Sequence, residues 1–139
     1  MNCLEILQPD DFHHHLRDGD VLQDTVMHAA AEFNRVIVMP NLQPPVTNLH
    51  VAMAYRERIL SHSTSNDFTP LMTLYLTDLT TPNIVEDAFL SGLVYAVKLY
   101  PNGATTNSQN GVTNLDKLDL VFQVKTTYSI DVCCSDCIV

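Results

Sequence analysis

The chain has 139 residues, of which 46% are hydrophobic, and its 16 acidic and 7 basic side chains give a formal net charge of −9. This length and composition predict one globular domain with a buried core. Because the negative charge would repel a phosphate backbone, we expect no binding of nucleic acid or of an anionic membrane. A small anionic substrate is compatible with this charge, because one well-placed arginine can bind it.

The same sequence contains no sign of export or of membrane insertion. No apolar stretch approaches the roughly 20 residues that span a bilayer, and residues 1–9 resemble neither a signal peptide nor a transit peptide. Three of the four cysteines, Cys133, Cys134 and Cys137, stand close together, which is not the spacing of a disulfide framework. Their Cys-x-x-Cys spacing lacks a second ligand pair, so a metal site there is disfavoured. We expect the chain as given to be cytoplasmic.

Strand-like apolar runs alternate with helical spacing along the chain. Strands are expected at residues 6–15, 36–39, 70–77 and 93–100, and helices at residues 21–33, 51–60, 81–91 and 115–124. Asp20 is expected to cap the first helix, and Pro82 occupies a favourable first-turn position in the third. A polar loop at residues 101–113 follows the fourth strand, and loops of this length are usually functional.

Alternating strands and helices predict a parallel sheet with right-handed crossovers and helices on its outer face. A complete (β/α)8 barrel needs about 250 residues, so four such units make about half a barrel. We therefore predict an α/β fold over residues 1–124, a partial TIM (β/α)8 barrel with about its first four β/α units. Residues 125–139 are expected to be a tail outside the barrel that need not be ordered. In such barrels, active-site residues lie at the C-terminal ends of the strands.

Three histidines stand at the end of the first expected strand. Side chains alternate between the two faces of a strand, so His13 and His15 share one face and His14 points away. Two imidazoles on one face can bind one metal ion, and neutral imidazole suits zinc. The alternative is a polar strand end whose imidazoles are solvated.

Two further residues near strand ends have the chemistry to bind a carboxylate. Arg17 faces the same end of the predicted barrel as His15 if the extended backbone continues, and its guanidinium could then donate two hydrogen bonds to a carboxylate. A surface ion pair is the alternative role. Asn41 follows the second strand and offers both a donor and an acceptor. A simple turn residue would have the same pattern.

Lys98 stands inside an apolar run, where burial favours its neutral amine. A neutral amine can react with carbon dioxide to give a carbamate, an anionic ligand that can bridge two metal ions. The alternative is a buried stem whose ammonium group reaches solvent. In the loop that follows, Thr105 and Thr106 carry hydroxyls that could reach a substrate, although by themselves they are ordinary loop residues.

Three ordered motifs together resemble the monofunctional dihydroorotases of bacteria and plants, which belong to the amidohydrolase superfamily. The motifs are DDFHHHLRDGD at residues 10–20, VIVMPNL with PPVT at residues 36–47, and AVKLYP with ATTNS and GVT at residues 96–113. The resemblance extends from about residue 6 to about residue 115. It implies a barrel with two zinc ions that reversibly hydrolyses the cyclic amide of dihydroorotate to carbamoyl aspartate in de novo pyrimidine biosynthesis.

By position in these motifs, the resemblance also implies a role for individual residues. His13 and His15 would bind one zinc ion, and N6-carboxylated Lys98 would bridge both ions. The implied substrate-binding residues are His15, Arg17, Asn41, Thr105 and Thr106. Members of the family are often homodimers, and plant members can carry a presequence for the mitochondrion or plastid.

The sequence departs from the family at two places. His14 stands where the family usually has an apolar residue, which matters little for an outward side chain. From about Gln123 the resemblance is lost, and the family's two further histidine ligands and its proton-shuttling aspartate have no counterpart. We therefore expect no catalytic residue and no activity in this chain alone. The alternative to a dihydroorotase is a noncatalytic truncated fragment that self-associates through exposed strand edges or is degraded.

Overall fold

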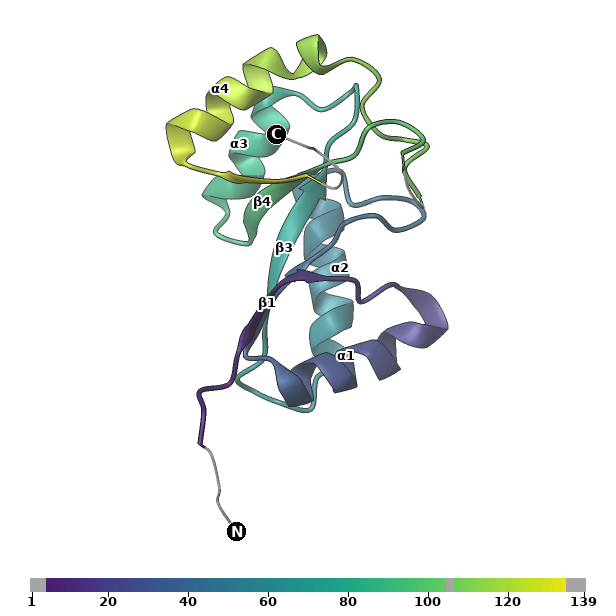
Figure 1. Cartoon of the computed structure of the whole chain (residues 1–139), viewed down its shortest axis with the longest axis vertical. Helices are drawn as coiled ribbons and strands as arrows, with labels where there is room; N and C mark the ends of the chain where they lie inside the picture. The colour runs from purple at the N-terminus through teal and green to yellow at the C-terminus, as the bar shows by residue number, and fades with distance from the viewer. Residues whose placement is uncertain (1–4, 105–106, 135–139) are drawn as a thin grey trace.

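The computed structural model describes residues 5–104 and 107–134, in which helices and strands alternate (Figure 1). The strands are β1 (Asp10–His14), β2 (Arg35–Val38), β3 (Thr69–Tyr75), β4 (Val94–Leu99) and β5 (Asp131–Cys134). The α-helices are α1 (Leu22–Glu32), α2 (Leu49–His62), α3 (Pro82–Leu90) and α4 (Asp119–Tyr128), and two short 3-10 helices are η1 (Gly19–Val21) and η2 (Leu115–Leu118). Within these residues, no helix is long and apolar enough to cross a membrane.

The strands form one sheet in the order β1-β2-β3-β4-β5, and all four neighbouring pairs are parallel. Helix α1 packs against α2, and α3 packs against α4 (Figure 1). This curled parallel sheet with helices in its crossovers confirms the predicted partial TIM barrel. All strands end at the same edge, so the loops that follow them are brought together there.

The core lies between the sheet and the helices. Its buried residues come from the strands, as Val36, Val38, Leu74 and Val97, and from the helices, as Val26, Ala52, Ile59, Val85 and Ala88. Burying a valine, leucine or isoleucine side chain stabilises the fold by about 1.5–3 kcal/mol. Tyr55 of α2 is fully buried, and its hydroxyl donates a hydrogen bond to the backbone oxygen of Arg17, which ties α2 to the loop after β1.

Side-chain caps explain where two of the helices begin. Asn48 accepts a hydrogen bond from the backbone of Val51 at the start of α2, and Thr81 accepts one from Ile84 at the start of α3. Pro82 stands in the first turn of α3, as predicted.

The expected cap at Asp20 is wrong. Asp18 instead accepts a hydrogen bond from Gly19 N and caps η1, which leads directly into α1. Arg17 and Gly19 have positive φ angles of 64° and 67°, so the chain turns before it reaches Asp20. Asp20 then falls inside η1.

The predicted boundary at residue 124 falls inside α4, and residues 125–134 continue the fold. Ser129 ends α4 in a left-handed conformation, with φ 55°, and β5 then pairs with β4. Apolar burial explains why residues 125–134 are part of the fold, because Ile130 is only 1% exposed and Val132 packs against the core. The rest of the predicted tail, residues 135–139, lies outside the described residues.

Replacing Ile130 with alanine tests whether this part of the chain is packed. We expect Ile130→Ala to lower the free energy of unfolding by about 2–4 kcal/mol, because it removes buried volume next to the sheet. Leu120→Ala is the control, since Leu120 is 61% exposed, and it should cost less than about 0.5 kcal/mol. Urea unfolding measures both. Equal, small effects would contradict the packing of β5.

Candidate active site at the C-terminal ends of the strands

Two of the three histidines converge at the end of β1. The Nε2 atoms of His13 and His15 lie 3.2 Å apart, and their ring centroids are separated by 5.2 Å. His14 turns the other way, with its Nδ1 2.7 Å from Asp11 Oδ2 and its ring edge against Phe33. The predicted sharing of one face by His13 and His15 is confirmed.

The surroundings keep both converging imidazoles neutral near pH 7. Burial and the positive charge of Lys98 lower the pKa of His13, against a smaller opposing effect of Asp11. Burial, followed by the charges of Arg17, His13 and Lys98, lowers the pKa of His15 to about 4. Neutral imidazole is the protonation state that a metal ion requires.

Lys98 lies in β4 and is fully buried, so its ammonium group does not reach solvent as the alternative proposed. Its Nζ lies 5.1 Å from the centroid of the Tyr100 ring. Strand alternation explains the position, because neighbouring Val97 and Leu99 belong to the core under the helices and Lys98 faces the other side. Lys98 contributes to the lowered pKa of both His13 and His15, so these three predicted residues lie near one another.

Arg17 reaches the same end of the sheet by a different backbone path from the one expected. The extended conformation does not continue, because Arg17 has a φ of 64° and its backbone oxygen is held by Tyr55. Arg17 nevertheless lines a cavity of about 470 Å³, together with Asn41. We call this cavity the arginine hollow; its other lining residues are Asp18, Gly19, Leu42, Gln43 and Asn107.

Asn41 connects the arginine hollow with the histidines. It is only 5% exposed, and its side chain forms a hydrogen bond with His15. Asn41 is therefore a buried link between two predicted parts of the site rather than a simple turn residue. Thr105 and Thr106, the remaining predicted binding residues, lie outside the described residues.

The loop after β4 is folded back on itself at its base. Val112 N donates to Tyr100 O at 2.8 Å, and Asn102 N donates to Val112 O at 3.0 Å. Gly111 is required at this turn, because a Cβ atom there would lie 2.4 Å from Tyr100 O. The tight base limits where Asn107 can lie.

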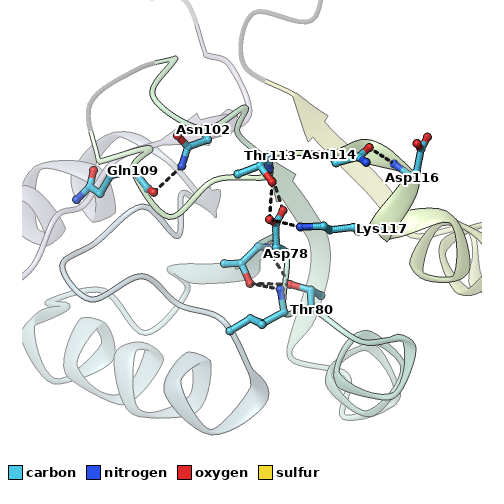
Figure 2. Close-up of polar contacts among 10 residues, drawn as sticks. Asp78, Thr80, Asn102, Gln109, Thr113, Asn114, Asp116 and Lys117 are labelled. Carbon is cyan, nitrogen blue, oxygen red and sulfur yellow. Dashed lines mark hydrogen bonds and ion pairs between the residues drawn. The ribbon is translucent and has the colours of Figure 1, made fainter.

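Asp78, just after β3, holds the C-terminal end of the same loop (Figure 2). Its carboxylate accepts hydrogen bonds from Thr113 N at 2.9 Å, Thr113 Oγ1 at 2.6 Å and Lys117 Nζ at 2.7 Å. These bonds hold the pKa of Asp78 well below its ordinary value, with the largest effect from Lys117. We call this arrangement the Asp78 clasp. Beside it lies a separate cavity of about 580 Å³, which Asp78 and Thr113 help to line.

Sequence reasoning missed both Asp78 and Asn107. The signal for Asp78 was its place directly after a strand, the same criterion that identified Asn41. Asn107 had a weaker signal, because asparagine is enriched where the backbone is left-handed, and its φ is 59°. Across residues 5–104 and 107–134, no group of three or more His, Cys, Asp or Glu residues could hold a metal ion.

Replacing Asp78 with asparagine should destabilise the protein in a pH-dependent way. A carboxylate with a lowered pKa stabilises the folded state fully above its ordinary pKa of 3.8, and this contribution decreases as the pH falls from there through the lowered pKa. Wild type should therefore exceed Asp78→Asn in stability at pH 7, and the difference should shrink below pH 3.8.

Urea unfolding across this pH range measures the difference. Asp87→Asn, which removes an exposed carboxylate of α3, is the matched control and should have little effect. A difference between wild type and Asp78→Asn that stays constant from pH 7 to acid would contradict the clasp.

Comparison with known proteins gives matches to curated sequences, whereas no protein-family model matches the chain. The chain is 53% identical over 134 residues to a dihydroorotase of Chelativorans sp., which covers 96% of the chain and 39% of that protein. It is 60% identical over 113 residues to a mitochondrial dihydroorotase of Arabidopsis thaliana, covering 81% of the chain and 30% of that protein. The match with the Chelativorans protein therefore includes most of residues 125–134.

Solved structures give the same result. A dihydroorotase from Campylobacter jejuni superposes with a TM-score of 0.83 at 34% identity, over 91% of the chain and 37% of that protein. A Saccharomyces cerevisiae dihydroorotase, solved with 5-fluoroorotic acid, gives a TM-score of 0.84 at 27% identity, over 91% of the chain and 35% of that protein. The chain spans between 30% and 39% of the length of these relatives.

Proposed function

Since the chain is homologous to the dihydroorotases, a family of hydrolases, over about a third of their length, we propose that it forms part of the active site of a dihydroorotase-like zinc hydrolase. The reaction is the reversible hydrolysis of the cyclic amide of dihydroorotate to carbamoyl aspartate, in de novo pyrimidine biosynthesis. The observation that carries the proposal is the convergence of His13, His15 and Lys98 beside the arginine hollow, at one end of a parallel sheet.

The three converging residues have the chemistry to bind zinc. His13 and His15 present neutral imidazoles whose Nε2 atoms are 3.2 Å apart, and N6-carboxylated Lys98 would supply an anionic oxygen ligand shared by two ions. Bound zinc lowers the pKa of a water ligand and polarises a carbonyl. The fully buried position of Lys98 supports this role, because burial favours the neutral amine that carboxylation needs.

The arginine hollow suits the carboxylate of the substrate. The guanidinium of Arg17 can donate two parallel hydrogen bonds to a carboxylate, and the Asn41 amide can donate another. At about 470 Å³, the hollow lies within the range of small-molecule sites. Asn41 also contacts His15, so a carboxylate held in the hollow lies next to the proposed metal ligands. Thr105 and Thr106 are proposed to contact the same substrate.

A noncatalytic, self-associating fragment is the second candidate function. Within the described residues, β1 and β5 have a pairing partner on one side only, and unpaired strand edges can pair with another chain. Phe12 of β1 is 69% exposed, which adds apolar surface beside one of these edges. Zinc affinity that depends on His15 supports the first candidate, and self-association of the same sample without such affinity supports the second.

The proposed metal ligands should bind zinc weakly. Two imidazoles leave most of the coordination shell to water, so affinity should fall far short of a complete protein site. His15→Ala should lower zinc affinity at least tenfold, whereas Cys137→Ala should leave it unchanged. Titration against a competing chromophoric chelator measures both variants. The opposite dependence would place the metal at the cysteines.

The purified chain of 139 residues should not turn over dihydroorotate, even with zinc and bicarbonate. Catalytic groups act as a unit, and the described residues supply only part of a two-metal ligand set. A hydrolysis assay beside a full-length dihydroorotase tests this, and light scattering on the same sample reports self-association. Zinc-dependent turnover within about a hundredfold of the full-length enzyme, a barrier difference of about 2.7 kcal/mol, would contradict the expectation.

A further inference from the structure

Asn107 joins the loop after β4 to the loop after β2. Its Nδ2 donates to the backbone oxygen of Asn41 at 3.2 Å, and its Oδ1 accepts from Gln43 Nε2 at 3.2 Å. The backbone oxygen of Asn107 accepts from the Tyr75 hydroxyl at 3.1 Å. One residue therefore contacts segments at the ends of β2 and β3 while it belongs to the loop after β4.

We propose that Asn107 is a positioning residue for carboxylate recognition, acting through Asn41. By holding the Asn41 backbone, it directs the Asn41 amide between the arginine hollow and His15. Both Asn41 and Asn107 line the hollow with Arg17, so a shift of the Asn41 backbone changes the site that the carboxylate enters. This inference rests on the proposed function, because it assumes that the hollow binds the carboxylate of dihydroorotate.

The chemistry of the position requires an amide. Asn107 uses its donor and its acceptor at once, and aspartate, which has the same shape, would place a carboxylate oxygen against the carbonyl of Asn41. The backbone adds a second requirement, because φ is 59° and only glycine, asparagine and aspartate adopt such angles readily. Glycine would therefore keep the loop conformation and remove only the side-chain bonds.

Asn107 is also connected, through Tyr75 and Tyr100, to the buried Lys98. The Tyr75 ring stacks on Tyr100, with centroids 5.1 Å apart, and the Tyr100 ring centroid lies 5.1 Å from Lys98 Nζ. Asn107 is thus held by Tyr75, whose stacking partner Tyr100 lies against Lys98. This packing explains how a loop residue can position Asn41 accurately, because its own place is determined by rigid strand ends.

The test measures dihydroorotate binding to the full chain without added zinc, by NMR titration, so that the hollow is probed by itself. Asn107→Gly should weaken binding at least fivefold, and Asn107→Asp should weaken it further. The matched controls are Asn110→Gly and Asn110→Asp, which change an exposed asparagine of the same loop and should stay within twofold of wild type. Urea unfolding should show that Asn107→Gly folds.

A double-mutant cycle separates positioning from a general structural role. In an Asn41→Ala background, Asn107→Gly should weaken binding less than twofold, because the amide that it positions is already gone. Equal weakening in both backgrounds, or an unchanged affinity of Asn107→Gly, would overturn the inference and leave the proposed function standing. If wild type does not bind dihydroorotate at all, the proposed function and the inference fail together.

Discussion

Parallel pairing of all five strands is the constraint on which the candidate site depends. Every crossover helix returns the chain to the same starting edge of the sheet, so the polar residues that follow β1, β2 and β4 meet at the opposite edge. The alternation of side chains along each strand then determines which face of the sheet each residue occupies. On β4, Val97 and Leu99 are buried under the helices, while Lys98 is buried on the other face, toward His13 and His15.

The loops after the strands complete the candidate site, and side-chain hydrogen bonds help to hold them in place. The Asp78 clasp holds one end of the loop after β4, Gly111 allows its base to close, and Asn107 connects it to Asn41. A binding site needs such support, because side chains on an unsupported loop would be too loosely placed to recognise a ligand.

Residues 125–134 complete α4 and add β5 to the parallel sheet. Pairing of β5 with β4 places Cys133 opposite Lys98 in the register, so the residues after α4 belong to the sheet that carries the site. The same pairing leaves β5 as an edge of the sheet within the described residues. A chain that matches about a third of a dihydroorotase thus combines a parallel set of strand ends with an edge strand that can pair further.

The sequence by itself determined the α/β alternation, the half-barrel and the residues at the strand ends, because strand and helix periodicity and strand alternation are local properties. That local information was enough to put His13 and His15 on one face and to bury Lys98. Only the tertiary structure decided the left-handed turn at Arg17, the packing of Ile130 and the contacts of Asp78 and Asn107. Each of these depends on a partner distant in the sequence, such as Tyr55 for Arg17 or Lys117 for Asp78. The periodicity of the sequence does not indicate such pairs, because they form only when the folded sheet brings the loops together.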